Sequence, residues 1–303
     1  MTTHAGIAIT HAERVVFAAP AVSKGDLAAY VARVAPRLLR HAAGRPLQLL
    51  RCPDGVAAGC FVQRHWTGAR GTRHVRTVDV DEKDGDTSPY AVVRTAPGLV
   101  TLVQHGAVEL HAWGCRADRL DRPDRLVLDL DPAPGVAWRD VVAGAVAIRD
   151  LLADAGLDSG CALSGGKGIH VVAPLDRRAD WETHAAFARA VAERLAAEAP
   201  SRFVAGASKA DREGRTYVDW LRNVRGATAI VPWSPRARDG APIAVPLPWD
   251  DLAAARRADR WHVHDVDALL REWGDADPFE ALLATRQSLG RNAWAVMGVA
   301  PPG

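Results

Sequence analysis

Two aspartates one residue apart close the apolar run in RLVLDLDPAPG, residues 125–135. Side chains alternate between the two faces of a β-strand, so Asp129 and Asp131 are expected on one face while Leu128 and Leu130 point into the opposite layer. Two carboxylates side by side repel each other unless a positive charge holds them together. The spacing therefore suggests a site for a divalent metal ion.

A third carboxylate, Asp219 in YVDWLRN, is expected on a separate strand. Three such carboxylates can hold two metal ions about 4 Å apart, one activating a 3′-hydroxyl and the other neutralising a triphosphate. Oxygen ligands suit Mg²⁺ or Mn²⁺ rather than zinc. The alternative for the aspartate pair taken alone is that aspartates at a strand end serve as turn or cap residues.

The glycine-rich stretch SGGKGIHVV, residues 164–172, is expected as a turn between two strands. Such a turn leaves backbone amides free to meet phosphate, with Ser164 adding a donor, Lys167 a charge, and His170 lying in the outgoing strand. Its spacing fits neither the P-loop nor the dinucleotide-binding fingerprint. A plain β-hairpin with a permissive turn remains the alternative.

Arginines follow the third carboxylate in DWLRNVRGATAIVPWSPRAR, at positions 222, 225, 236 and 238. Arginine pairs with phosphate through two parallel hydrogen bonds, so this segment could clamp a triphosphate and a nucleic-acid backbone. The alternative is a charged surface hairpin. His111 in VELHAWG, taken by itself, is more typical of a structural histidine than of a functional one.

The charge of the chain is balanced overall but uneven locally. The formal net charge is +2, which says nothing about nucleic acid because patches of opposite sign cancel in the sum. Six arginines and only one acidic residue, Asp54, lie between Arg45 and Arg76, whereas DVDEKDGD at 79–86 is acidic and typical of a solvated turn. This distribution favours a face that binds a polyanion, with scattered surface arginines as the alternative.

The four cysteines, at positions 52, 60, 115 and 161, have neither CxxC spacing nor histidine pairs at zinc-ligand intervals. We expect them to be reduced and mostly buried. The first residues lack a signal-peptide pattern, and no run approaches the roughly 18 apolar residues of a membrane span. The sequence therefore predicts a cytoplasmic protein that is not associated with a membrane.

The pattern along 303 residues predicts an α/β protein. Residues 1–22 suggest a short strand or arm, and 23–44 a helix with Ser23 as N-cap, Asp26 in its first turn and Gly44 as its stop. Short apolar runs broken by Gly and Pro over 46–113 indicate strands and turns. Helices are predicted at 137–157 and 180–200, a strand over RTYVDWLRN, and further helices after Trp249, such as DLAAARRA.

Six motifs in this order form a family pattern: RPLQLLRCPDG, CFVQRHW, VELHAWG, DRPDRLVLDLDP, SGGKGIHV and YVDWLRNVRGATAIVPWSPRAR. The chain closely resembles, from about residue 8 to 290, the polymerase domain of bacterial ligase D, a member of the archaeo-eukaryotic primase superfamily used in non-homologous end joining. The resemblance implies a primase-type core, in which an RRM-like mixed sheet packs with an N-terminal α/β lobe and C-terminal helices. It implies one domain over 1–303, with the lobe and its DNA-binding elements at about 1–113, the catalytic sheet at 114–247 and the helical part at 248–303.

The resemblance also implies roles for individual residues. Asp129, Asp131 and Asp219 would be the catalytic metal ligands. The incoming nucleotide would be contacted by His111, Ser164, Lys167, His170, Arg222 and Arg236. DNA would be bound by Arg14, Lys24, Arg51, Phe61 and Arg64.

Within that DNA-binding set, Arg14 and Lys24 match a basic pair that grips the 5′-phosphate of a recessed downstream strand, and Phe61 matches the first of two aromatics that stack on template bases. The chain departs from the family at two places. Val62 replaces the second aromatic, so one stacking platform, worth about 1–3 kcal/mol per base, is expected to be missing. Arg64 replaces a frequent lysine, which keeps the charge but changes its geometry.

The function that follows is a DNA-directed nucleotidyltransferase that extends a 3′-hydroxyl primer at breaks or short gaps with two Mn²⁺ or Mg²⁺ ions and NTP or dNTP as substrate. Family resemblance adds a preference for ribonucleotides and for Mn²⁺. No adenylation motif or nuclease segment is recognisable, so we expect a free-standing polymerase or excised domain that works with Ku and a separate DNA ligase. Two alternatives stay open, a primase-polymerase that starts chains without a primer and a non-catalytic scaffold that binds DNA ends.

Overall fold

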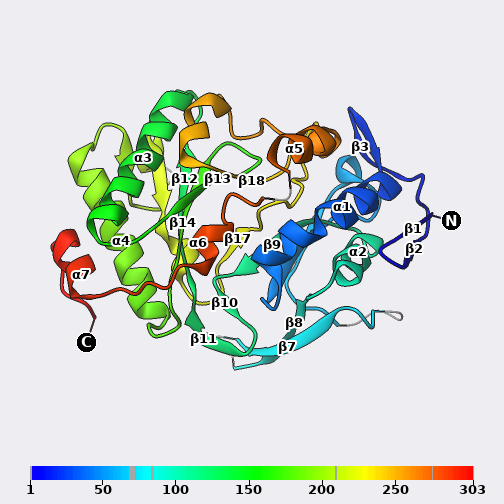
Figure 1. The fold of residues 1–303 in the computed structure, drawn as a ribbon, viewed down its shortest axis with the longest axis horizontal. Helices are drawn as coiled ribbons and strands as arrows, with labels where there is room; N and C mark the ends of the chain where they lie inside the picture. The colour runs from blue at the N-terminus through cyan, green and yellow to red at the C-terminus, as the bar shows by residue number, and fades with distance from the viewer. Residues whose placement is uncertain (1, 68–71, 83–84, 209, 275, 303) are drawn as a thin grey trace. The chain divides into compact units, whose positions relative to one another are not determined.

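The computed structural model describes residues 2–67, 72–82, 85–208, 210–274 and 276–302 (Figure 1). They form two compact units built from interleaved stretches of sequence. Unit 1 comprises Met1–Leu120, Ile230–Ala244 and Trp261–Asp275, and unit 2 comprises Asp121–Ala229, Val245–Arg260 and Ala276–Gly303. Both units mix helices and strands, which confirms the predicted α/β class. No helix among the described residues combines the length and apolar composition needed to cross a membrane.

Unit 1 is built on an antiparallel sheet in which the strands run in the order β9-β5-β8-β7, with β6 paired to the other part of β5. These strands are β5 (Leu47–Arg51), β6 (Phe61–Gln63), β7 (Arg76–Asp81), β8 (Thr87–Val92) and β9 (Ala107–Trp113). The N-terminal hairpins are β1 (Thr2–His4) with β2 (Ile7–Ile9) and β3 (Val15–Ala18) with β4 (Ala21–Ser23). The helical elements are α1 (Lys24–Ala42), η1 (Val56–Ala58), α2 (Ala96–Gln104), η6 (Val263–Asp265) and α5 (Val266–Trp273).

Helix α1 begins as predicted. The Ser23 side chain accepts a hydrogen bond from the backbone N–H of Asp26, and the Asp26 carboxylate accepts one from the backbone N–H of Ser23, so each satisfies a donor that the helix start leaves unpaired. The helix ends at Ala42, and Gly44 takes the left-handed backbone conformation that stops it.

Helix α2 corrects the prediction that only strands and turns occupy 46–113. Thr95 caps its first turn by accepting from the N–H of Gly98, and a proline sits at the start, where its missing N–H costs nothing. Its apolar residues are buried almost all round, so helix α2 lacks the one-sided periodicity that would have identified it. Helices α1 and α2 pack against each other.

Unit 2 is built on a six-stranded sheet in the order β15-β16-β12-β14-β13-β18. Its strands are β12 (Arg125–Pro132), β13 (Gly160–Leu163), β14 (Ile169–Pro174), β15 (Phe203–Val204), β16 (Thr216–Asp219) and β18 (Val245–Leu247). Its helical elements are α3 (Trp138–Asp154), α4 (Trp181–Glu198), η2 (Ala210–Arg212), η3 (Trp220–Asn223), η4 (Trp249–Asp251), η5 (Ala253–Ala255), α6 (Glu280–Ala284) and α7 (Arg291–Met297). Three short strands, β10 (Cys115–Arg116), β11 (Arg119–Pro123) and β17 (Thr228–Ile230), lie near points where the sequence passes between units.

Both faces of the unit 2 sheet are covered, and β12 shows how its residues divide between them. Leu128 and Leu130 are completely buried, and Leu130 lies against Gly144 of α3, which with α4 covers one face (Figure 1). Val127 points the other way and packs with Phe279, just before α6. Asp129 and Asp131 share the face of Val127, as the alternation predicts.

Two other predictions in unit 2 need correction. Strand β16 ends at Asp219, where the Asp219 side chain accepts from the N–H of Leu221 and starts the 3₁₀ turn η3, so RTYVDWLRN is half strand and half turn. The segment DLAAARRA forms 3₁₀ turns instead of a regular helix. The last of these turns ends where Arg256 takes the left-handed conformation.

The cysteine prediction is wrong for one pair. Cys52 and Cys60 form a disulfide, while Cys115 and Cys161 are buried thiols, as expected. The reason is strand pairing. Arg51 lies opposite Phe61 in the β5–β6 pair, so Cys52, which follows Arg51, lies next to Cys60, which precedes Phe61. Spacing along the chain does not reveal that register.

Candidate active site

The predicted carboxylates meet on β12 and its neighbour β16. The strand register places Asp129 opposite Asp219 of β16 on one side and opposite His170 of β14 on the other. Asp131 lies opposite Tyr217. Antiparallel pairing thus turns residues that are distant in sequence into one row across three strands.

Arg222 of η3 bridges two of these carboxylates. Its Nη2 lies 3.2 Å from Oδ2 of Asp129 and 3.1 Å from Oδ2 of Asp219. His170 approaches the other oxygen of Asp129, with Nε2 3.4 Å from Oδ1. The Tyr217 hydroxyl donates to Asp219 at 3.3 Å. Positive charge therefore already sits between the two carboxylates.

The two bridged carboxylates differ in acidity. Burial alone would raise the pKa of Asp129, but His170 and Arg222 lower it to about 2. Burial, helped by the charge of Asp129, raises the pKa of Asp219 above its ordinary value even though Arg222 opposes this. Burial and the nearby Asp219 also raise the pKa of Tyr217 to about 12, so this hydroxyl stays protonated at neutral pH.

Asp131 has its own cationic partners. Lys167 places Nζ 2.9 Å from Oδ1 of Asp131 and donates to the carbonyl of Pro132 at 3.0 Å. Arg212 lies 3.4 Å from the other oxygen, and its guanidinium stacks 3.8 Å above the Tyr217 ring. Arg212 and Tyr217 were not among the predicted site residues, because nothing in KADREGRTY separates them from surface residues.

The glycine turn between β13 and β14 differs from the prediction in how its amides are used. The Ser164 hydroxyl accepts from the N–H groups of Gly166 and Gly168, and the N–H of Gly165 donates to Ala258. A Cβ on Gly168 would lie 2.1 Å from the Leu130 carbonyl, so only glycine fits there. These three amides are not free to meet phosphate, and the turn instead presents the charge of Lys167.

A groove lies beside this turn within unit 2, with a volume of about 330 Å³. The loop from Pro132 to Val136 lines one side of it, and Lys167, Arg256 and Arg257 contribute basic side chains. Of the other arginines after Asp219, Arg225 lies 3.5 Å from Asp121.

The carboxylate row, formed by Asp129, Asp131 and Asp219, offers oxygen donors that fit a hard divalent cation. Carboxylate oxygens are the donors that Mg²⁺ and Mn²⁺ prefer, and Arg222 Nη2 already lies within 3.2 Å of an oxygen of Asp129 and of Asp219. Among the described residues, only His262, His264 and Asp265 have three metal-ligand atoms within 4.8 Å of one another. Hydrogen bonds within that trio account for it, since the backbone N–H of His262 and its ring both contact Asp265 Oδ2, which caps the turn.

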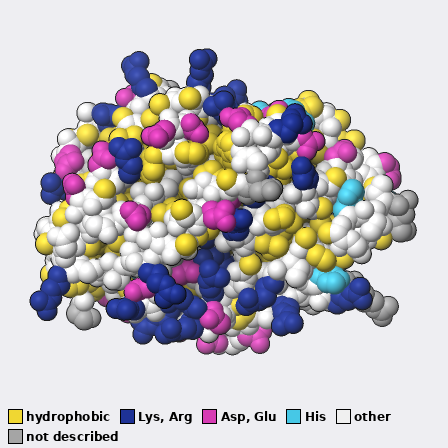
Figure 2. All heavy atoms as spheres, in the orientation of Figure 1, with side chains coloured by type: hydrophobic (Ala, Val, Ile, Leu, Met, Phe, Trp, Pro, Cys, Tyr) yellow, Lys and Arg dark blue, Asp and Glu magenta, His cyan; other side chains and the backbone are white. Residues whose placement is uncertain are grey.

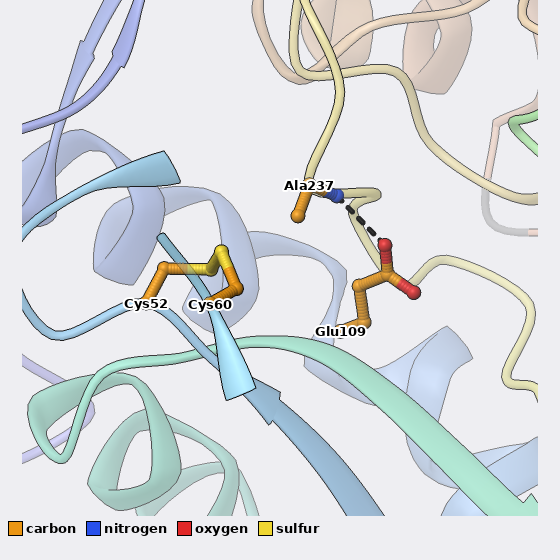
Figure 3. Close-up of a disulfide and its surroundings, with 4 residues drawn as sticks. All are labelled: Cys52, Cys60, Glu109 and Ala237. Atoms are coloured by element: carbon orange, nitrogen blue, oxygen red, sulfur yellow. Dashed lines mark hydrogen bonds between the residues drawn. A yellow bond between two sulfur atoms is a disulfide. The ribbon is translucent and has the colours of Figure 1, made fainter. Parts of the chain in front are cut away.

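His111 and Arg236, expected to contact the nucleotide, belong to unit 1 and share a carboxylate there. Glu109 Oε2 lies 2.8 Å from His111 Nε2 and 3.1 Å from Arg236 Nε, and Oε1 accepts from the N–H of Ala237 at 2.8 Å (Figure 3). His111 in VELHAWG was predicted from the sequence, but Glu109 was not. The available signal was a lone acid between Val108 and Leu110 in an apolar strand.

The residues expected to bind DNA also lie in unit 1. Arg14 donates to the carbonyl of Pro53 at 2.6 Å, and Lys24 donates to that of Thr10 at 3.0 Å. The two bases are neighbours, because the backbone N–H of Lys24 donates to the Arg14 carbonyl at 2.8 Å. Burial and the nearby charge of Arg14 lower the pKa of Lys24. A cavity of about 850 Å³ is lined by the first turns of α1, by residues of the N-terminal hairpins and by the segment 10–13 between them.

The remaining DNA-binding predictions concern the β5–β6 hairpin. Arg51 lies with its guanidinium 5.4 Å from the centre of the Phe61 ring and donates to the His105 carbonyl. Phe61 and Val62 are both half-exposed, and Arg64 is exposed. Of the six arginines counted between 45 and 76, Arg70 lies outside the described residues. Figure 2 shows Lys and Arg side chains gathered in groups on the visible face.

Comparison with known proteins gives one consistent result. A family model described as the primase-polymerase domain of LigD matches residues 23–279. The chain is 37% identical over 286 residues to the multifunctional non-homologous end joining protein LigD of Pseudomonas aeruginosa, covering 94% of this chain and 34% of that protein. It is 33% identical over 254 residues to the corresponding LigD of Mycobacterium tuberculosis, covering 81% of this chain and 33% of that protein.

A solved structure agrees with these sequence matches. The polymerase domain of ligase D from Mycobacterium tuberculosis, in complex with DNA, aligns with a TM-score of 0.84 and 31% identity, covering 92% of this chain and 98% of that one. The expected primase-type fold is thereby confirmed. The chain spans about a third of the length of the curated relatives named above.

Proposed function

Because the chain belongs to the LigD primase-polymerase family, we propose that it is a DNA-directed nucleotidyltransferase that fills gaps and extends 3′ ends in non-homologous end joining. The observation that carries the proposal is the row of Asp129, Asp219 and His170 across three strands, with Asp131 two residues further along β12. The partners that follow are DNA ends or gaps with a 5′-phosphate, Ku, and a DNA ligase. The protein would act in the cytoplasm, at the nucleoid.

Asp129, Asp131 and Asp219 would hold two divalent cations. Bound metals of this kind lower the pKa of an attacking 3′-hydroxyl and neutralise a triphosphate. The protein's own groups bind and orient the substrate. Lys167 and Arg222, which help to neutralise the carboxylates in this structure, carry charges that suit the phosphates once cations take over that task.

The finer features of the proposal rest on family membership. They are a preference for ribonucleotides over deoxynucleotides, for Mn²⁺ over Mg²⁺, and roles for Ser164, Lys167, His170 and Arg222 at the nucleotide. Ser164 is buried and its hydroxyl already accepts two backbone hydrogen bonds, so its contribution is to shape the turn that carries Lys167.

The test is extension of a labelled primer across a 5′-phosphorylated one-nucleotide gap, with NTP or dNTP and with Mn²⁺ or Mg²⁺. We expect templated addition that needs metal and falls at least about 100-fold in Asp129→Asn, which keeps the shape of the side chain and removes its charge. Glu198→Gln is the matched control, because it removes a carboxylate from an exposed ion pair with Arg194 on α4. Absence of addition by the parent under every condition, with DNA still bound, would refute the proposal and favour a scaffold.

A further inference from the structure

Glu109 is a buried carboxylate in the middle of β9. Its residue is 5% exposed, and its neighbours along the strand, Val108 and Leu110, belong to the core. A buried charge is costly unless it is paired and hydrogen-bonded. Its place in the sheet therefore calls for a reason other than packing.

Both carboxylate oxygens are engaged by groups from two separate segments of unit 1. Oε2 meets His111 Nε2 at 2.8 Å and Arg236 Nε at 3.1 Å, and Oε1 accepts from the N–H of Ala237 at 2.8 Å. Figure 3 shows the Glu109 side chain directed at the Ala237 amide. One carboxylate thus ties a side chain of its own strand to the loop that carries Arg236.

The exposed fraction of the three side chains rises from Glu109 to Arg236 to His111. The Glu109 side chain is 6% exposed, whereas those of Arg236 and His111 are 17% and 24% exposed. The carboxylate lies behind two cationic groups that solvent can reach. Such an arrangement is typical of a group that orients the residues that bind a ligand, because it fixes the histidine proton on one nitrogen and the plane of the guanidinium.

We infer that Glu109 is a positioning residue that holds His111 and Arg236 in the orientation in which they contact the phosphates of the incoming nucleoside triphosphate. The inference rests on the proposed function and adds a residue to it. Burial alone would raise the pKa of Glu109, but the His111 hydrogen bond, the Arg236 charge and the Ala237 amide lower it to about 2. Glu109 is therefore a fixed negative charge at neutral pH.

The first variant is Glu109→Gln. Glutamine keeps the size and can still accept from Ala237, but it turns an amide N–H₂ toward His111 and Arg236, which are donors themselves. We expect the KM for NTP to rise at least about tenfold while kcat falls less than about threefold, because binding of the triphosphate is what is lost. Affinity for the gapped DNA should match that of the parent. A purely structural role would lower DNA affinity and the melting temperature and leave the KM for NTP unchanged.

A double-mutant cycle separates positioning from a general defect. In a chain that already carries His111→Ala and Arg236→Ala, Glu109→Gln should raise KM no further, because the groups that it positions are gone. Glu198→Gln, on the exposed face of α4, serves as the control and should leave both constants at parental values. A penalty of full size in the double-alanine background would overturn the inference.

Two further outcomes are decisive. If Glu109→Gln does not fold, Glu109→Asp replaces it, because it keeps the charge on a side chain shorter by one methylene. This variant should raise the KM for NTP by an intermediate factor. A folded Asp variant with parental KM would overturn the inference. A parent that extends primers and a Glu109→Gln variant with parental KM would overturn it as well. A parent that extends no primer at all would instead refute the proposed function.

Discussion

At the scale of single residues, the site is a set of carboxylates that the protein neutralises with its own cations. Arg222 joins Asp129 and Asp219, and Lys167 and Arg212 hold Asp131. The arrangement resolves the repulsion that the aspartate spacing implies, and it does so with groups that are also suited to phosphate.

We predict that Arg222→Ala lowers the free energy of unfolding of the metal-free protein by about 1–2 kcal/mol, a value reduced because Arg222 is more than a third exposed. The cause is the mutual repulsion of Asp129 and Asp219 once the bridge is gone. Denaturant unfolding in EDTA and in Mn²⁺ checks it, and Mn²⁺ should stabilise the variant more than the parent. Equal stabilisation of the two proteins by Mn²⁺ would contradict the idea that Arg222 occupies a cation position.

The sequence predicted the residues of this site better than their contacts. Strand alternation was enough to place Asp129 and Asp131 on one face, and Asp219 could be assigned to a separate strand. The partners Arg212 and Tyr217 could not be found, because they depend on which strand pairs with β12 and in which register. Glu109 was missed for a related reason, since its partner Arg236 is 127 positions away in sequence and reaches it only in the folded unit.

At the scale of elements, the β5–β6 hairpin is closed by the Cys52–Cys60 disulfide and carries Arg51 and Phe61. We predict that reduction lowers the free energy of unfolding by about 2–3 kcal/mol, because it frees a loop that the bond closes across a sequence separation of 8 in the unfolded chain. Denaturant unfolding with and without a phosphine reductant checks this.

Cys60→Ser provides the control for that measurement, because the reductant should not change its stability. Thiol titration of the denatured parent should find two thiols before reduction and four afterwards. Four thiols before reduction would show that the bond does not form.

Helix α4 contains a buried histidine that makes stability depend on pH. His184 is completely buried, and its Nδ1 lies 2.9 Å from the carbonyl of Asp180, to which it donates. Burial lowers its pKa, partly opposed by that hydrogen bond and by nearby carboxylates. The unfolded chain therefore binds a proton at this histidine near pH 6.5, whereas the folded chain does not. The stabilisation that results is fully present above that pH and is lost as the pH falls below it.

We accordingly predict that His184→Asn, which keeps a donor for the Asp180 carbonyl, flattens the fall in unfolding free energy between pH 7 and pH 5, by at most about 1.4 kcal/mol per pH unit. Urea unfolding at several pH values measures the slope. His11→Asn, at a solvent-exposed histidine, should leave it unchanged. Parallel slopes for His184→Asn and the parent would contradict the assignment.

At the scale of the whole molecule, the α/β class and the main helices of unit 2 followed from periodicity, whereas the composition of the two units did not. The chain returns to unit 1 at Ile230–Ala244 and Trp261–Asp275, so Arg236 joins a unit whose first stretch of sequence ends at Leu120. Local patterns record which residues are buried, but they do not record which distant segments share a core. Helix α2 shows the same limit within one element, since uniform burial removed its periodicity.

The described residues expected to bind DNA all belong to unit 1, and the carboxylate row belongs to unit 2. Charge removal in unit 1 should therefore change how DNA is held without changing the chemical step.

We predict that Arg14→Ala combined with Lys24→Ala abolishes the preference for a 5′-phosphorylated gap and reduces the slope of log affinity against log salt by about 2, since each lost phosphate contact contributes about 0.9. The value of kcat at saturating DNA should stay parental. Binding titrations between 50 and 200 mM salt, chosen as the range where such slopes are large, measure the change. The matched control is Arg33→Ala combined with Arg194→Ala, which removes two exposed, ion-paired arginines elsewhere. An equal loss of slope in that control would mean that overall charge, and not a phosphate grip at Arg14 and Lys24, holds the DNA.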